Sequence, residues 1–244
     1  QPARKVGVLE HRHYPNLVTL YLNSNRLKKL PKLHCAKLEV LYFVDNQITT
    51  LGELVASHLP KLANIRATNN LIEGRLPKLE FAEPAAYAHL ETAHRVGIGD
   101  AGGATESPNA IIEQNKLQKN LFPVQSRKIK VISIADNQLN DMSALKDWKL
   151  PSITELTCCG NSFFGVLPEM ALPTLLKLNL SNNALTDISC LGTSELDSLT
   201  VLSLANNKLT EFPALRFMRL EQLDVSDNQI DEASKLEQSQ LPRL

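Results

Sequence analysis

The sequence predicts an α/β solenoid, with a curved parallel sheet on the concave face and loops and short 3₁₀ or α turns on the convex face. Three observations lead to this fold class. The 244 residues include 42 Leu and 19 Asn, so Leu is about one residue in six. Both residue types recur in a single frame that matches eight times. Outside one break, the Asn residues of successive matches lie 21 to 24 residues apart. No single copy can bury its apolar face alone, so the copies must stack.

Three copies precede the break. In the first copy, Leu17, Leu20 and Leu22 occupy offsets 0, 3 and 5, Asn25 occupies offset 8, and Leu27 occupies offset 10. The Leu-x-Leu part predicts a three-residue strand whose alternate residues point into the core. The Asn is predicted to satisfy backbone groups where the chain turns off the strand, because its amide offers both donors and an acceptor. The next two copies run from Leu38 to Ile48 and from Leu62 to Ile72.

Residues from about Pro77 to Lys128 interrupt the frame. Within this break, 78–106 is predicted to be an irregular, disordered insert, because an alanine-rich stretch leads into a glycine-rich one. Gly97, Gly99 and Gly102 match a dinucleotide-binding pattern there, but the segment before them is helix-like instead of a strand, so no cofactor is expected. Asn115 lies 22 residues before Asn137, which predicts a ninth, degenerate copy.

Five copies follow the break. Their Asn residues are Asn137, Asn161, Asn183, Asn207 and Asn228. Leu241 then starts a further match, so we expect 1–244 to be a single domain that is a segment of a longer chain. The segments 70–77 and 161–168 share a Gly-x-Leu-Pro pattern at an offset of 91 residues. Two interpretations of this offset stay open, an ancestral duplication and a coincidence among similar copies.

The frame resembles the leucine-rich repeat family, whose pattern is L-x-x-L-x-L-x-x-N-x-L, over about four fifths of the chain. Most copies carry a further apolar residue, such as Leu33 or Leu54, which is similar to the short intracellular class of about 22 residues. That class occurs in phosphatase regulatory subunits, tubulin-folding cofactors and axonemal proteins. The resemblance implies a cytoplasmic, non-enzymatic scaffold or regulatory subunit that binds protein partners in a multi-subunit assembly, with a cytoskeletal or axonemal setting among the options.

Two other functions stay open at this point. One is an extracellular or surface recognition module, which flanking cysteine caps or a signal peptide in the full reading frame would favour. The other is a regulatory domain of an enzyme whose catalytic part lies outside this sequence.

Composition and motifs narrow the chemistry. The 26 basic and 26 acidic residues give no net charge, which does not indicate a nucleic-acid partner. No apolar run of roughly 18 residues indicates a membrane span. The six His and four Cys have no recognised zinc spacing, and no nucleophile–base motif or phosphate loop is present. We therefore expect no catalytic residue, metal, cofactor or small-molecule substrate. Cys158 is predicted in the core as a small apolar residue and Cys159 on the concave face, both reduced.

Binding is predicted on the concave face, which is lined by the residues that flank the inward-facing leucines. Tyr21, Tyr42 and Arg66 should be neighbours on adjacent strands, about 5 Å apart. Tyr and Arg are enriched in binding hot spots, although the three side chains also fit a purely structural cross-strand stack. The predicted partner-binding residues are Tyr21, Tyr42, Arg66, Asn23, Asn64 and Thr68. A second, weaker candidate patch is acidic and comprises Asp136, Glu155, Asp224 and Asp227.

Overall fold

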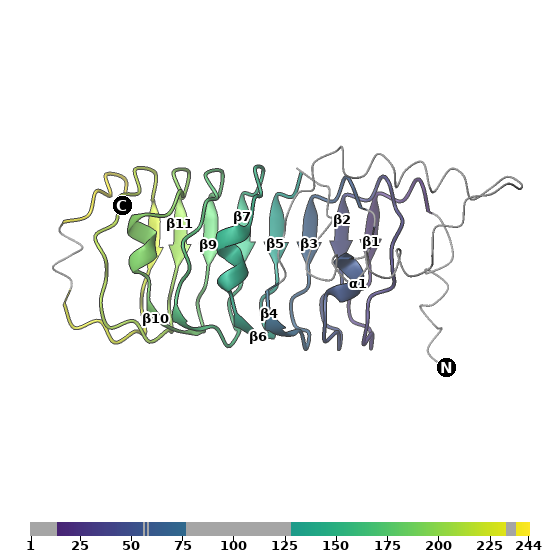
Figure 1. Cartoon of the computed structure of the whole chain (residues 1–244), viewed down its shortest axis with the longest axis horizontal. Helices are drawn as coiled ribbons and strands as arrows, with labels where there is room; N and C mark the ends of the chain where they lie inside the picture. Colours follow the sequence, from purple (N-terminus) through teal and green to yellow (C-terminus); the bar gives the residue numbers. More distant parts are fainter. Residues whose placement is uncertain (1–13, 56, 58, 77–127, 233–237) are drawn as a thin grey trace, which may run out of the picture.

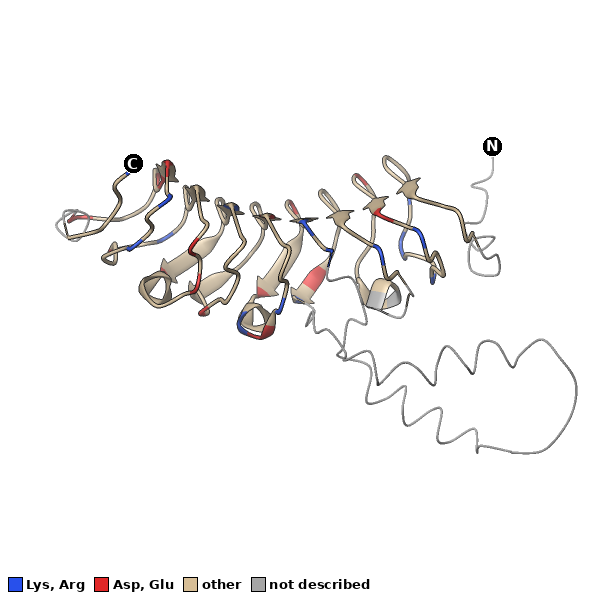
Figure 2. Cartoon of the chain, turned by 90° about the horizontal axis from the view of Figure 1, so that it is seen from above, with Lys and Arg blue, Asp and Glu red and all other residues tan. Residues whose placement is uncertain are grey.

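The computed structural model describes residues 14–55, 57, 59–76, 128–232 and 238–244. In these ranges eight short strands form one parallel sheet (Figure 1). In spatial order they are β1 (Thr19–Tyr21), β2 (Val40–Tyr42), β3 (Asn64–Arg66), β5 (Val131–Ser133), β7 (Glu155–Thr157), β9 (Lys177–Asn179), β11 (Val201–Ser203) and β12 (Gln222–Asp224). The sheet lines the inner side of a curved stack, and the remaining segments form its outer side (Figure 2). The predicted solenoid is therefore confirmed.

Each of the six inner strands buries its middle residue, and every strand of the sheet leaves its two outer residues on the concave face. In β2, Leu41 is fully buried while Val40 and Tyr42 are partly exposed. The strands pair in register, so each concave position forms a column across the sheet. The strands begin one residue earlier than the expected Leu-x-Leu segments. This is a difference of boundary only, because the ladder continues through the Leu22 N–H, which donates to the Tyr42 carbonyl at 2.7 Å.

The third and fourth repeats are direct neighbours in the sheet. Asn64, Ile65 and Arg66 of β3 pair with Val131, Ile132 and Ser133 of β5. No strand of residues 77–127 therefore lies between them, and the expectation of a ninth copy at this point in the stack is wrong. The predicted insert at 78–106, the Gly97–Gly102 pattern and Asn115 itself lie outside the described residues.

The turn role of the repeated Asn is confirmed. The Asn137 amide donates to the carbonyls of Ala67, Ile134 and Ala135, and its Oδ1 accepts from the Ile72 N–H, all within 2.8–3.1 Å. Two of these partners belong to the preceding repeat, so the side chain ties neighbouring repeats together as well as closing its own turn. The same arrangement recurs at Asn46, Asn70, Asn161, Asn183, Asn207 and Asn228.

The convex side holds the predicted short turns of helix and, in addition, four strands that were not expected. The helical turns are α1 (Gly52–Val55), η4 (Ser143–Asp147) and η5 (Ser189–Gly192). The strands are β4 (Glu73–Arg75), which pairs with β6 (Gln138–Asp141), and β8 (Phe164–Val166), which pairs with β10 (Ala184–Asp187). β4 and β8 contain the glycines of the Gly-x-Leu-Pro segments, Gly74 and Gly165, at φ of 82° and 75°.

The offset of 91 residues does not correspond to a constant displacement in the stack. It separates Asn70 from Asn161 by two repeats. The Asp-Asn-Gln triplets at Asp45, Asp136 and Asp227 are also 91 residues apart, but Asp45 and Asp136 are separated by two repeats and Asp136 and Asp227 by four. Residues 77–127 add sequence length without adding a strand between β3 and β5, so a fixed offset in sequence does not correspond to a fixed number of repeats, and both interpretations of the offset stay open. The structure does contain a convex pattern that recurs every two repeats. A Gly-containing convex strand (β4 or β8) is followed in the next repeat by a second convex strand (β6 or β10) and a 3₁₀ turn (η4 or η5).

The apolar frame residues form one continuous core, which includes the fully buried Phe43, Phe163 and Trp148. Leu20 and Leu223, in the two outermost strands, are only partly buried. Beyond β12, the Leu244 N–H donates to the Leu241 carbonyl at 3.2 Å, which repeats the bond from Leu220 to Phe217 at the start of β12's repeat. The wider statement, that 1–244 is one domain cut from a longer chain, stays a prediction. In the described part of the chain, no helix has the length and apolar character needed to cross a membrane.

Candidate concave binding surface

The structure brings the three principal predicted residues together. Tyr21, Tyr42 and Arg66 occupy the last position of β1, β2 and β3, and the parallel register pairs Tyr21 with Tyr42 and Tyr42 with Arg66. Residues at the two ends of a strand triplet face the same side of the sheet, because side chains alternate along a strand. All three side chains therefore lie on the concave face, and we refer to them below as the Tyr–Arg cluster.

The members of the Tyr–Arg cluster contact one another. The rings of Tyr21 and Tyr42 meet edge to face, with centroids 5.3 Å apart and an interplanar angle of 62°. The guanidinium carbon of Arg66 lies 5.1 Å from the centroid of the Tyr42 ring, a cation–π geometry. Tyr21 nevertheless keeps 63% of its surface exposed, and Arg66 is exposed as well. The side chains thus form the cross-strand stack and also present a preordered, solvent-facing surface.

The three flanking residues have different roles. Asn23 accepts a hydrogen bond from the Val44 N–H at 2.9 Å, so part of its amide supports the turn after β1. The Thr68 hydroxyl lies 2.9 Å from the Ser133 hydroxyl on the neighbouring repeat. Asn64 begins β3 and is half-buried between Val40 and Val131 in register. All three border the Tyr–Arg cluster, and their contact with a partner stays a prediction.

Two of the four residues of the acidic candidate patch are turn residues, and the other two lie in β7 and β12. Asp136 and Asp227 have φ of 52° and 53°, a left-handed conformation that Asp adopts more readily than most residues. Asp224 accepts hydrogen bonds from the Ser226 N–H at 3.1 Å and the Ser226 hydroxyl at 2.6 Å. The bonds to Ser226 lower the pKa of the Asp224 carboxyl. Backbone conformation accounts for Asp136 and Asp227, and the bonds to Ser226 account for Asp224, without a ligand.

Cys158 and Cys159 lie where the sequence placed them. Cys158 is fully buried, Cys159 is half-buried on the concave side after β7, and all four cysteines are free thiols. Burial raises the pKa of the Cys35, Cys158 and Cys159 thiols, and raises that of Cys190 to about 11. Thiols with raised pKa values are poor nucleophiles and poor metal ligands at neutral pH. The described residues contain no group of three His, Cys, Asp or Glu side chains placed to hold a metal ion.

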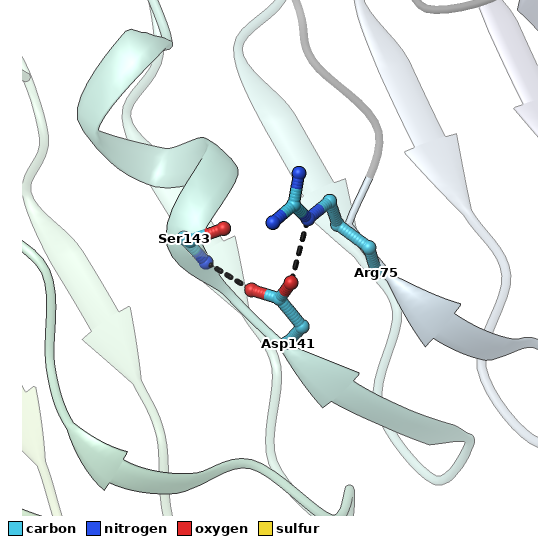
Figure 3. Close-up of polar contacts among 3 residues, drawn as sticks. All are labelled: Arg75, Asp141 and Ser143. Atoms are coloured by element: carbon cyan, nitrogen blue, oxygen red, sulfur yellow. Dashed lines mark hydrogen bonds and ion pairs between the residues drawn. The ribbon is translucent and has the colours of Figure 1, made fainter.

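A second exposed apolar surface, which sequence reasoning missed, lies on the convex side. On β8, Phe164 is 67% exposed and Val166 is 61% exposed. They border a hollow of about 360 Å³ that is also lined by Asn140, Asp141, Met142, Ser143 and Pro168. Asp141 on its rim binds Arg75 at 2.6 Å and accepts from the Ser143 N–H at 2.8 Å (Figure 3). The available signal was the Phe163-Phe164 pair, of which the repeat frame buries only the first.

The repeated Leu and Asn pattern matches the model of a known protein family. The family model for leucine-rich repeats in two copies matches residues 15–56, 173–217 and 197–238. The chain contains leucine-rich repeats at residues 15–56 and 173–238. The matched ranges cover repeats on both sides of the break, and the hydrogen-bonded Asn of the frame is common to all of them. The sequence matches no curated protein.

Solved structures with leucine-rich repeat solenoids are similar to this chain. The ectodomain of the Arabidopsis thaliana membrane receptor kinase GASSHO1/SCHENGEN3 aligns at a TM-score of 0.54 and 20% identity, over 91% of this chain and 26% of that one. An internalin of Listeria monocytogenes aligns at 0.47 and 18%, over 94% and 60%. A leucine-rich repeat protein of Leptospira interrogans aligns at 0.47 and 20%, over 94% and 59%. This chain thus spans between about a quarter and three fifths of the lengths of these proteins.

At 20% identity and a TM-score of 0.54, the likeness to the Arabidopsis ectodomain shows the fold alone. Leucine-rich repeat proteins are in general binding modules for other proteins, without catalytic activity of their own. The features particular to this leucine-rich repeat chain are the Tyr–Arg cluster on β1–β3 and the apolar convex surface at β8.

Proposed function

We propose that this protein is a non-enzymatic interaction scaffold or regulatory subunit that binds a protein partner through its concave face, with the Tyr–Arg cluster as the main contact. One observation carries the proposal. Two tyrosines and an arginine are stacked on adjacent strands, where Tyr21 and Arg66 remain exposed and Tyr42 is partly exposed. Large, preordered side chains of these types lose little conformational entropy on binding and contribute much of the energy of interfaces.

The rest of the concave face favours close approach of a partner. The columns beyond β3 carry mostly small residues, including Ser133, Thr157 and Ser203. Small side chains allow a partner backbone or helix to lie near the sheet while the Tyr–Arg cluster contacts it at the N-terminal end. This arrangement favours a protein partner over a small molecule, which needs an enclosed cavity.

We propose further that the protein works in a reducing compartment, in a multi-subunit assembly. All four cysteines are free, and Cys35 and Cys158 are buried in the core. Secreted proteins of oxidising compartments usually pair their cysteines. The assembly itself, including a cytoskeletal or axonemal setting, is proposed from the likeness to the short intracellular repeat class alone.

The test is an affinity purification from cells with quantitative mass spectrometry. It compares the wild-type protein with a Tyr21→Ala/Tyr42→Ala/Arg66→Ala variant. The matched control is Thr157→Ala/Ser203→Ala/Gln222→Ala, which changes three concave positions outside the Tyr–Arg cluster. Circular dichroism first establishes that all three proteins fold. We expect a set of proteins to be retained by the wild type and the control and lost from the cluster variant.

Retention of the same set by the cluster variant would contradict the concave site. The convex surface then becomes the next candidate, and Phe164→Ser/Val166→Ser is the variant that examines it.

A further inference from the structure

We infer that the partner segment seated on the Tyr–Arg cluster is acidic, and that it places an Asp or Glu carboxylate against the guanidinium of Arg66. This inference rests on the proposed function and names the chemistry of the partner. It starts from the bonding state of Arg66. The guanidinium contacts the Tyr42 ring, and among the described residues no carboxylate forms an ion pair with it.

The geometry of Arg66 suits a carboxylate. A guanidinium is planar, so stacking against an aromatic ring occupies one face and leaves the N–H groups at the edge available. Those N–H groups match the two oxygens of a carboxylate in a bidentate pair. A partner that covers the exposed Tyr21 ring also shields this pair from water, which strengthens the interaction between the charges.

The concave columns of the first three repeats contain no charged side chain besides Arg66. Nine side chains of the first three repeats line the concave columns, and Arg66 is the charged one among them. The other eight are Thr19, Tyr21, Asn23, Val40, Tyr42, Val44, Asn64 and Thr68. The later repeats differ, because their concave columns carry Glu155, Lys177 and Asp224. A positive charge among aromatic, aliphatic and amide groups favours a partner that combines carboxylates with apolar side chains.

The N-terminal section, residues 14–76, carries a net positive charge, as Arg66 does. Residues 14–76 contain eight Lys and Arg and four Asp and Glu, a net charge of +4. Residues 128–232 and 238–244 together contain nine Lys and Arg and fourteen Asp and Glu, a net charge of −5. The balanced composition of the chain therefore conceals two sections of opposite sign (Figure 2). Long-range attraction would bring an acidic segment to the N-terminal section and orient it there.

The experiment uses a phage library of random twelve-residue peptides as the probe. The library is selected against the wild-type protein, against Arg66→Glu, and against Tyr21→Ala/Tyr42→Ala. We expect peptides rich in Asp and Glu, with aromatic or aliphatic residues between them, from the wild type. Reversal of the charge in Arg66→Glu should remove the acidic preference.

Affinities of the selected peptides are then measured by fluorescence anisotropy. For an acidic peptide, Arg66→Gln should weaken binding at least tenfold, Arg66→Lys should weaken it less, and the control Lys177→Gln should leave it unchanged. Raising the ionic strength from about 0.05 to 0.3 M should weaken binding to the wild type and have less effect on Arg66→Gln.

The possible outcomes separate this inference from the proposed function. Peptides that bind the wild type without acidic enrichment, and are lost from the tyrosine variant, overturn the inference and leave the concave site standing. Peptides retained by the tyrosine variant overturn both. Selection that enriches no peptide also overturns the inference, because a cluster that docks a short acidic segment should capture one.

Discussion

At the scale of single residues, the turn of each repeat depends on two consecutive residues, the Asn of the frame and the residue before it. The Asn of the frame bonds both its own turn and the preceding repeat, and the residue before it adopts a positive φ. Asp, Asn, Ser and Gly fill that second position, which are residues that tolerate the left-handed region or have no Cβ. They are Ser24, Asp45, Asn69, Asp136, Gly160, Asn182, Asn206 and Asp227. The positive φ required at this position accounts for Asp136 and Asp227, which otherwise resemble part of an acidic binding patch.

Replacement of Asn137 by Ala should lower the free energy of unfolding by about 1–3 kcal/mol, because buried backbone groups lose their partners. Asn137 is 8% exposed and makes four hydrogen bonds. Asn140, which is exposed and three residues away, is the matched control, and Asn140→Ala should change stability by no more than about 0.5 kcal/mol. Urea denaturation measures both variants. Equal stabilities for the two variants would refute the turn role of Asn137.

At the scale of elements, the sequence predicts the concave sheet better than the convex side. The buried positions of Leu41 and its equivalents determine which neighbours face inward, so the columns with Tyr42 and Arg66 could be derived in register. The convex strands depend on backbone pairing between repeats, and short segments such as 73–75 carry no period that separates strand from loop. Gly74 and Gly165 were visible as a shared pattern, but their positive φ is a property of the folded chain. The exposed Phe164 was missed for the same reason.

The ion pair between Arg75 of β4 and Asp141 of β6 should contribute less to the free energy of unfolding at low pH. Asp141 accepts from Arg75 and from the Ser143 N–H, and these bonds lower the pKa of its carboxyl to about 2. Since the folded pKa lies below the unfolded value of about 3.9, the ionised carboxylate stabilises the fold above pH 4 and loses this effect as pH falls toward 2. Both side chains are partly exposed, so we expect Asp141→Asn to cost less than about 1 kcal/mol at pH 7.

The measurement is urea denaturation of wild type and Asp141→Asn between pH 7 and pH 3, where the stability difference should narrow below pH 4. Asp187 is the matched control, because it accepts from the Ser189 N–H at 2.7 Å in the same way while Val166 takes the position of Arg75. Asp187→Asn should have the smaller effect at pH 7. A difference for Asp141→Asn that stays constant down to pH 3 would show that the Arg75 contact contributes nothing.

At the scale of the whole molecule, the solenoid is continuous through the break in sequence. β3 and β5 pair as closely as any other neighbours in the sheet, and the Ile72 N–H reaches the Asn137 side chain across the junction at 3.0 Å. The sequence could not reveal this continuity, because spacing alone made residues around Asn115 resemble another repeat. In a repeat protein each unit is stabilised mainly by its neighbours, so we expect the pairing of β3 with β5 to couple the stability of the two sections of opposite net charge.

This continuity predicts that residues 77–128 can be replaced by a short connection without loss of the fold. The seven residues 168–174, which link Leu167 to Leu175 in the fifth repeat, are the natural donor. Inserted between Leu76 and Ile129, they give Asn70 and Asn137 the 22-residue separation of Asn161 and Asn183. We expect strand content by circular dichroism to be retained and thermal unfolding to remain a single transition. Two separate transitions, or loss of the native spectrum, would show that residues 77–128 stabilise the junction by packing on the solenoid.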